Sequence, residues 1–232
     1  GSEIGLDKIR LIFKSYPHFS WIDVTGGEIF LRDDLVSIIQ EIVRNSKRLE
    51  YLHFPTNGLC KDTFDNIKEI RRLFRGNMVI SVSIDGNESL HDKIRGVKGG
   101  FRKAVTLLDN LLKSKMPATH VYAGMTLFSM NCEHIGSTYR AIKECIPEFS
   151  PDKLHVNFAH ENDYYDNKEQ GIAFHGNPEM LKSLPGQAGL SPFGLLEKSY
   201  RKLYSVYRSA GRCPVPCQSG KISVFLDCEG NL

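Results

Sequence analysis

The sequence predicts an α/β fold with a parallel sheet, because short apolar runs alternate with amphipathic helical patterns along most of its length. Five runs have the length and composition of β-strands: Trp21–Thr25, Tyr51–Thr56, Val79–Ile84, Tyr122–Phe128 and Leu154–Phe158. Their centres lie 30, 29, 43 and 31 residues apart, which matches the roughly 30 or more residues of a repeated βαβ unit. We therefore expect the strands to pair in parallel and in sequential order.

The segments between these strands carry apolar residues at helical spacing. The four apolar sets are Leu35, Ile38, Ile39 and Ile42; Phe64, Ile67, Ile70 and Phe74; Phe101, Val105, Leu108 and Leu112; and Ile135, Tyr139, Ile142 and Ile146. Each set shares one helix face, which can be buried against the sheet. Leu6–Ser15 predicts a further helix of the same kind, whose own strand should precede it. We therefore expect a βα array that lacks its first strand.

The pattern becomes less regular after Phe158. Residues 160–192 are rich in Asn, Asp, Gly, Pro and Lys and predict a long irregular excursion. A Leu- and Tyr-rich helical pattern over 195–207 follows, until Pro214 and Pro216 interrupt it. Lys221–Leu226 alternates like a strand, and Asp227–Asn231 predicts a turn.

Composition and charge exclude several classes of protein. The 30 Lys and Arg residues exceed the 27 Asp and Glu residues by only three, and no basic run concentrates the excess. A nucleic-acid partner is therefore not expected. No stretch approaches the roughly 18–20 apolar residues of a membrane span, and the start of the chain does not resemble a signal peptide. A membrane partner is therefore not expected either.

Small or polar residues follow every predicted strand. They are Gly26-Gly27-Glu28; Thr56-Asn57-Gly58; Ser83 with Asp85-Gly86; Ser129 with Asn131; and Asn157 with His160-Glu161. In parallel α/β folds, ligands bind where the carboxyl ends of the strands meet. Each group alone could be turn chemistry, but five together favour one shared pocket.

The Gly26-Gly27-Glu28 segment is the most specific of these groups. Two glycines allow backbone carbonyls to approach a ligand closely, and a neighbouring carboxylate can hold an ammonium group. It is not a phosphate-binding loop, because no Gly-Lys-Ser/Thr follows it. The alternative is a strand-ending turn with a solvated Glu28.

These motifs together resemble a known family. The series Thr25-Gly26-Gly27-Glu28, Leu31-Arg32, Thr56-Asn57-Gly58, Ser83-Ile84-Asp85-Gly86, His91-Asp92 and Arg95-Gly96 is similar to that of the radical S-adenosylmethionine (radical SAM) enzymes with a C-terminal SPASM or twitch extension. The resemblance runs from about residue 6 to the end of the chain. It implies a partial (β/α)6 barrel of the TIM-barrel type over residues 3–211, including the 160–192 excursion. Residues 212–232 would begin a domain for an auxiliary iron–sulfur cluster.

The resemblance also implies a role for individual residues in binding S-adenosylmethionine (AdoMet). Gly26, Gly27 and Glu28 match the motif that holds the methionine amino group. Ser83 and Asp85 match positions that face the ribose and the carboxylate. Arg95 matches an arginine that pairs with the carboxylate, and Asn131 matches a polar contact after the next strand.

The cysteines depart from the family pattern in one place and match it in another. The Cys-x3-Cys-x2-Cys loop that ligates the catalytic 4Fe–4S cluster is absent. Because that loop belongs after the strand expected upstream of Leu6, we expect a chain truncated at both ends that cannot assemble this cluster by itself. Twelve residues separate Cys217 from Gly230, as in the SPASM pattern, so Cys217 is the expected first ligand of the auxiliary cluster. The alternatives are a zinc knot formed with Cys213 and Cys228, or purely structural cysteines.

The function implied by the resemblance is that of a radical SAM enzyme core. With its 4Fe–4S cluster, such an enzyme generates a 5′-deoxyadenosyl radical for hydrogen abstraction in peptide modification or cofactor biosynthesis. The expected partners are a peptide or small-molecule substrate and an electron donor such as a flavodoxin or ferredoxin, in the cytoplasm. A degenerate (β/α) barrel that only binds a ligand is the first alternative. A hydrolase that uses Glu28 or Asp85 with His91 is the second.

Overall fold

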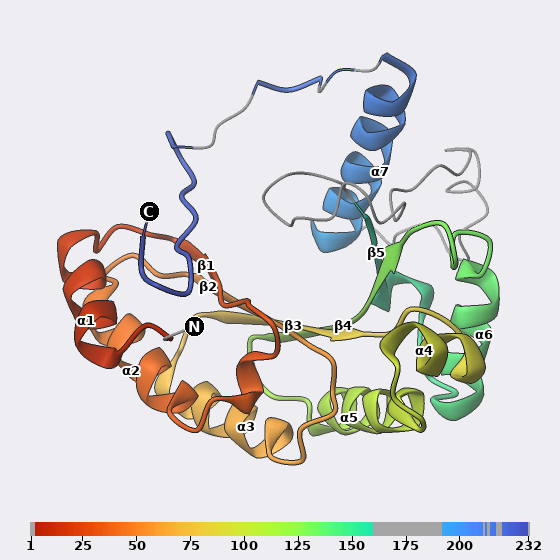
Figure 1. Ribbon diagram of the computed structural model, residues 1–232, viewed down its shortest axis with the longest axis horizontal. Helices are drawn as coiled ribbons and strands as arrows, with labels where there is room; N and C mark the ends of the chain where they lie inside the picture. Colours follow the sequence, from red (N-terminus) through yellow and green to blue (C-terminus); the bar gives the residue numbers. More distant parts are fainter. Residues whose placement is uncertain (1–2, 160–191, 211, 213, 217–219, 232) are drawn as a thin grey trace. The chain divides into compact units, whose positions relative to one another are not determined.

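The structure, a computed structural model, describes residues 3–159, 192–210, 212, 214–216 and 220–231. Its single five-stranded sheet has the order β1-β2-β3-β4-β5, as Figure 1 shows. The strands are β1 (Trp21–Asp23), β2 (Tyr51–Thr56), β3 (Asn77–Ser83), β4 (Thr119–Leu127) and β5 (Leu154–Phe158). β1 pairs with β2, and β4 with β5, in parallel. The predicted α/β class and sequential strand order are confirmed.

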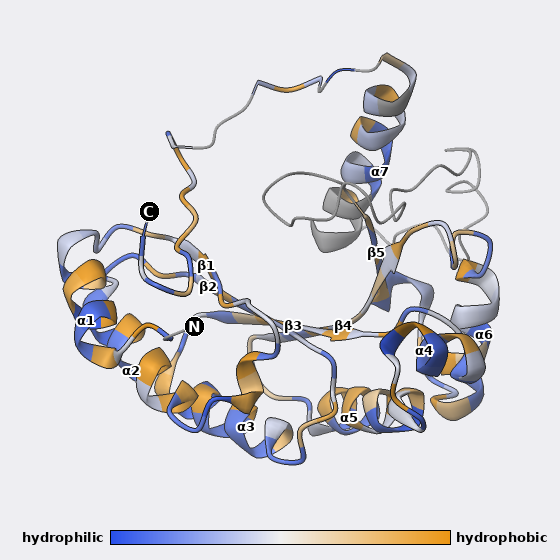
Figure 2. Ribbon diagram, in the orientation of Figure 1, coloured by the Kyte–Doolittle hydropathy of each residue, from blue (hydrophilic) through white to orange (hydrophobic). Residues whose placement is uncertain are grey.

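Helices alternate with the strands along most of the chain, and the first helix precedes β1. They are α1 (Leu6–Ser15), α2 (Leu35–Asn45), α3 (Thr63–Leu73), α4 (Glu88–Arg95), α5 (Gly100–Ser114), α6 (Ile135–Cys145) and α7 (Pro192–Ala210), with short 3-10 helices η1 (Ile29–Leu31) and η2 (Pro151–Lys153). The predicted apolar faces are largely buried, and Ile39, Ile67 and Ile142 are fully so. Figure 2 shows the two-sided hydropathy of α2, α3 and α5.

Contacts divide the described residues into two compact units. The first unit takes its residues from Gly1–Ser81, Asn110–Val121 and Cys217–Leu232. The second takes them from Val82–Asp109 and Tyr122–Pro216. Each unit has its own core and is considered separately below.

The core of the first unit lies between its helices and one face of its strands. Leu52 and Phe54 of β2 are fully buried, whereas the alternate residues Tyr51 and His53 are half-buried. This period-two pattern shows that β2 presents Leu52 and Phe54 to the core and His53 to the opposite face. α2 packs against both α1 and α3, which completes the helical layer.

The core of the second unit contains β4, β5 and α6. Met125 pairs in register with Val156, and both side chains are fully buried. Ile142 of α6 and Phe149 after it are buried as well. The stacked rings of Phe158 and Tyr204, with centroids 3.5 Å apart, connect β5 to α7.

One local expectation needs correction. Lys221–Leu226 is not a strand: Ser223 makes an isolated bridge, and its carbonyl accepts a hydrogen bond from the Gly220 N–H at 2.7 Å. The tail lies along the start of the first unit instead, where the Ile4 N–H donates to the Cys228 carbonyl at 2.8 Å. Alternation alone predicted the strand, but the segment does not pair as one. The turn over Asp227–Asn231 is confirmed, with Gly230 at φ 83°.

Several sequence expectations fall on residues that the structure does not describe. The 160–191 part of the irregular excursion lies outside the described residues, as do Cys213 and Cys217. Within the part of the chain that is described, no helix is both long enough and apolar enough to span a membrane.

Candidate functional site

The Gly-Gly-Glu segment connects β1 to η1, and its glutamate holds two loops together. Glu28 Oε1 accepts hydrogen bonds from Thr56 Oγ1 at 3.0 Å and from the Phe30 N–H at 3.3 Å. Glu28 Oε2 accepts one from the Asn57 N–H at 2.6 Å. The loops after β1 and β2 are therefore connected through this carboxylate, so both of its oxygens already have partners.

The two glycines before Glu28 are open to their surroundings. A Cβ atom added at Gly26 or at Gly27 would meet no atom within 4 Å, and both residues are exposed. A ligand could therefore approach the backbone at these two positions. The accessible part of the segment is its glycine backbone and not the Glu28 carboxylate.

Ser83 is the last residue of β3 and is half-buried. Its hydroxyl makes no hydrogen bond with the described part of the chain. The side chains of Asp85, Arg95 and Asn131, by contrast, all do. Ser83 therefore keeps its full capacity to donate to a ligand and to accept from one.

Asp85 and Arg95, which the resemblance assigns to the cofactor, pair with each other in the second unit. Arg95 Nε and Nη2 lie 2.7 and 2.6 Å from Asp85 Oδ2. Asp85 is 3% exposed, and its Oδ1 accepts a hydrogen bond from the Thr126 N–H at 3.1 Å. This carboxylate therefore connects α4 to the ends of β3 and β4.

Asn131 completes the same network and is fully buried. Its Nδ2 donates to the Asp85 carbonyl at 3.0 Å and to the Thr126 carbonyl at 2.9 Å. Its Oδ1 accepts from the Phe128 N–H at 2.9 Å. Both amide hydrogens are used within the protein, so Asn131 fixes the loop after β4 rather than presenting its amide to solvent.

His91 belongs to the same network and is buried. Its Nδ1 accepts the Asp85 N–H at 3.1 Å, which requires an unprotonated Nδ1. Burial lowers the pKa of His91, and the nearby charge of Asp85 offsets this effect only in part.

The lowered His91 pKa predicts a loss of stability in mild acid. The unfolded chain takes up the His91 proton near pH 6.5, whereas the folded protein resists it. Stability should be complete above that pH and fall below it, by at most about 1.4 kcal/mol per pH unit. His91→Gln keeps an acceptor oxygen but cannot titrate, so urea midpoints at about pH 7.5 and about pH 5.5 should differ less in this variant. The exposed His134→Gln is the control, and an unchanged acid loss in His91→Gln would contradict the assignment.

The structure also shows a polar constellation that sequence reasoning missed. His53 Nδ1 lies 2.8 Å from Asp23 Oδ1, and His53 Nε2 lies 2.9 Å from Ser81 Oγ. The three residues come from β1, β2 and β3 of the first unit. A detectable signal was present for two of the three. His53 lies between the core residues Leu52 and Phe54, and Ser81 lies between the core residues Ile80 and Val82.

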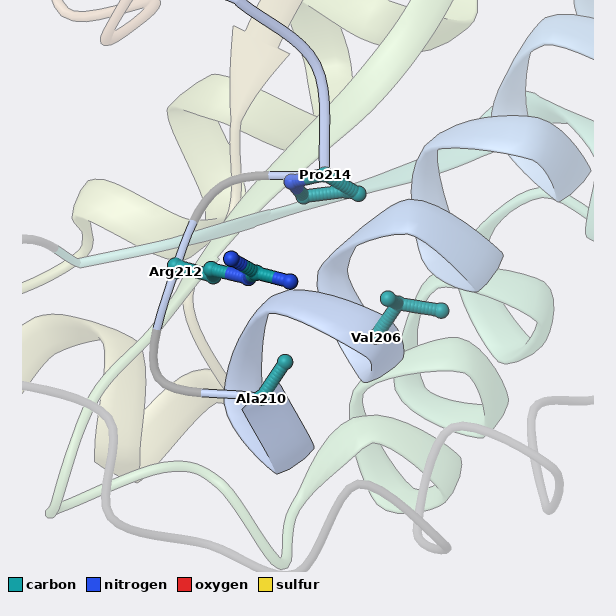
Figure 3. A pocket seen from close by; sticks show the side chains of 4 residues that line it. All are labelled: Val206, Ala210, Arg212 and Pro214. Atoms are coloured by element: carbon teal, nitrogen blue, oxygen red, sulfur yellow. The ribbon is translucent and has the colours of Figure 1, made fainter.

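The described residues contain no group of three His, Cys, Asp or Glu side chains placed to hold a metal ion. A pocket at the end of α7 is lined by Val206, Ala210, Arg212 and Pro214 (Figure 3). It contains none of the predicted site residues. The predicted site residues therefore fall into two separate groups: Gly26–Glu28 with the β2 loop in the first unit, and Ser83–Asp85 with its network in the second.

The strand order, the alternating helices and the polar strand ends define a partial (β/α) barrel. No family model matches the chain. The chain is 30% identical over 125 residues to the sporulation killing factor maturation protein SkfB of Bacillus subtilis (strain 168), a match of 53% of this chain and 27% of that protein. It is 24% identical over 128 residues to the antilisterial bacteriocin subtilosin biosynthesis protein AlbA of the same organism. That match covers 53% of this chain and 26% of AlbA. These matches span about a quarter of the length of the curated relatives.

The fold is similar to that of solved structures of anSMEcpe. The structure with bound AdoMet and Cp18Cys peptide has a TM-score of 0.54 at 16% identity, over 92% of this chain and 55% of the other. The structure with AdoMet and Kp18Cys peptide has a TM-score of 0.51 over the same shares, also at 16% identity. The resemblance to radical SAM enzymes of the SPASM type, inferred above from the motifs, is confirmed by these comparisons, as is the fold class.

Proposed function

We propose that this chain is the core of a radical SAM enzyme that modifies a peptide. The observation that carries the proposal is the Gly26-Gly27 backbone, which is open to a ligand while Glu28 holds the loop in place. A peptide substrate is favoured over a small molecule because one relative is a maturation protein and another a bacteriocin biosynthesis protein. The anSMEcpe structures of similar fold also contain a peptide together with AdoMet.

The described residues fit AdoMet through two kinds of group. Its ammonium needs acceptors, which accessible glycine carbonyls supply, and its ribose and carboxylate need hydroxyl or charged partners. We assign Gly26, Gly27 and Ser83 to direct contact. Glu28, Asp85, Arg95 and Asn131 then shape the two loops, since their side chains are engaged within the protein. Arg95 is the exception with spare donors, because its Nη1 is not used by Asp85.

We assign the catalytic cluster to a Cys-x3-Cys-x2-Cys loop, which is not among the 232 residues of the sequence. When bound together, a 4Fe–4S cluster and AdoMet supply a 5′-deoxyadenosyl radical that takes a hydrogen atom from the substrate. The chain's own residues bind and orient AdoMet. We further propose that Cys217 is the first ligand of an auxiliary cluster in a domain beginning near residue 212. A flavodoxin or ferredoxin would supply electrons in a reducing cytoplasm.

Gly27→Val tests the AdoMet assignment without disturbing the core. Because an added Cβ meets open space, the free energy of unfolding should change little, while the side chain occupies the ligand's approach. In the full-length protein, reconstituted anaerobically with iron and sulfide, we expect AdoMet to bind about tenfold or more weakly, equivalent to about 1.4 kcal/mol. Calorimetry measures binding, and chromatography of 5′-deoxyadenosine measures cleavage after reduction.

Gly136→Val is the matched control, because Gly136 in α6 is equally open but lies far along the chain from the motif. AdoMet binding should not change in this variant. Equal affinity in Gly27→Val and wild type would contradict the contact role of Gly27. A wild-type protein that binds AdoMet and carries a cluster but forms no 5′-deoxyadenosine would support the degenerate, ligand-binding alternative.

A further inference from the structure

Asp23, His53 and Ser81 form a hydrogen-bonded chain across three neighbouring strands. Asp23 and His53 are direct register partners in β1 and β2, and Ser81 lies on β3, the next strand of the sheet. The His53 side chain lies within hydrogen-bond reach of both, at 2.8 Å from Asp23 Oδ1 and 2.9 Å from Ser81 Oγ. The three occupy the strand face opposite the buried residues Leu52 and Phe54.

The chemistry of the three groups fixes which atom donates and which accepts in each of these hydrogen bonds. A carboxylate only accepts hydrogen bonds, so His53 Nδ1 must carry the hydrogen that faces Asp23. In the neutral ring the lone pair is then on Nε2, which accepts the Ser81 hydroxyl hydrogen. A hydroxyl donating to an imidazole that a carboxylate orients is the arrangement of an activated nucleophile.

Neighbouring aromatic rings hold the carboxylate in place. Trp21 Nε1 donates to Asp23 Oδ1 at 2.8 Å, and the Trp21 ring stacks on Tyr51 with centroids 4.8 Å apart. Burial acts to raise the pKa of Asp23, but the hydrogen bonds from His53 and Trp21 outweigh it and lower that pKa. Asp23 therefore stays ionised near neutral pH. With side chains 56% and 25% exposed, Asp23 and His53 also remain accessible.

We propose that Ser81 is a base-activated nucleophile that accepts an acyl group from an activated ester or thioester. Ser81 Oγ forms a bond to the acyl carbon, and the bond from that carbon to the leaving alcohol or thiol breaks. His53 Nε2 takes the Ser81 proton and returns it to the leaving group, while Asp23 holds the imidazole in the required tautomer. The step needs no oxidant, metal or cofactor, and it does not depend on the radical chemistry proposed above.

The surroundings of Ser81 indicate that acylation should be stoichiometric rather than rapidly turned over. β3 is hydrogen-bonded in the sheet on both sides, so its backbone N–H groups are committed to pairing. Stabilisation of a tetrahedral intermediate by free N–H groups, worth about 10²–10³ in rate elsewhere, is then weak. A slow acyl-serine is the expected product.

p-Nitrophenyl acetate is the probe for this site. We expect peptide mass spectrometry to find Ser81 acetylated faster than the exposed Ser37 of α2, with release of p-nitrophenolate. His53→Gln should slow acetylation of Ser81 about 100-fold, because general-base assistance typically contributes about 10²–10⁴. Asp23→Asn, a second and nearly isosteric variant, should slow it as well. His18→Gln changes an exposed histidine in the same unit and should have no effect.

Two results would overturn the proposal. One is acetylation of Ser81 no faster than that of Ser37 in the wild-type protein. The other is an unchanged rate of Ser81 acetylation in a folded His53→Gln or Asp23→Asn variant, because His53 would then not act as a general base. The acetylation assay contains neither AdoMet nor a reductant, so its failure would not contradict the radical SAM proposal. Likewise, failure of AdoMet cleavage would not contradict the acylation of Ser81.

Discussion

Asp85→Ala should destabilise the protein by about 3 kcal/mol, the lower end of the cost of breaking a buried ion pair. The change removes the partner of Arg95 Nε and Nη2 and leaves the Thr126 N–H without its acceptor. Arg95 keeps a third of its side chain exposed, so solvent relieves part of its lost pairing. Urea denaturation, followed by circular dichroism, measures the free energy of unfolding.

The control for Asp85 is Asp65→Ala, which removes an exposed carboxylate paired with Lys68 on α3. Surface pairs of this kind contribute roughly 0–1 kcal/mol, so the midpoint should hardly move. If Asp85→Ala cost no more than Asp65→Ala, the network around Asp85 would not stabilise the fold. Its residues would then be better explained as ligand contacts.

Arg71→Leu should cost about 2–4 kcal/mol, because one buried cation satisfies three backbone carbonyls. Arg71 is 8% exposed, and its Nη1 lies 2.8 Å from the Gly76 carbonyl, 3.1 Å from that of Ala118 and 3.3 Å from that of Pro117. The leucine fills part of the space but cannot donate a hydrogen bond, so the Gly76 carbonyl loses its Arg71 donor. The Ala118 carbonyl keeps the Met78 N–H, and the Pro117 carbonyl keeps the Thr119 hydroxyl, as remaining donors. Thermal and urea unfolding both report this loss.

Arg72→Leu is a matched control, since Arg72 is the next residue of α3 and is exposed. It should change the unfolding free energy by less than about 0.5 kcal/mol, as surface substitutions usually do. Equal effects of the two substitutions would mean that helix composition matters here, and not the carbonyl contacts.

Much of the fold could be predicted because the relevant signals are local. The helix over Leu6–Ser15 and the strands over Tyr51–Thr56 and Leu154–Phe158 have the predicted bounds. β3 and β4 begin earlier than the apolar runs, at Asn77 and Thr119. Strand pairing accounts for this difference, since the Met78 N–H donates to the Ala118 carbonyl at 2.8 Å. Pairing can extend a strand into residues whose own composition does not predict one.

α4 was missed because few of its residues are apolar, so its segment has no strong periodicity. Its ends stabilise it instead. Asn87 Oδ1 accepts the Leu90 N–H at 3.1 Å, and Gly96 adopts a left-handed conformation with φ 66°. Both are standard helix-capping residues at the expected positions, so the cap pattern in the sequence could have predicted this helix.

The sequence by itself determined the α/β class, the order of the elements and the position of Gly26-Gly27-Glu28 after a strand. These follow from periodicity and from turn residues, which act over a few positions of the chain. Only the tertiary structure decided the partners of the polar side chains. Asp85 pairs with Arg95, and His53 meets Asp23 and Ser81 from 30 and 28 positions away along the chain. Hydrogen bonds depend on ångström distances and on direction, which strand register and loop packing set and local sequence patterns do not.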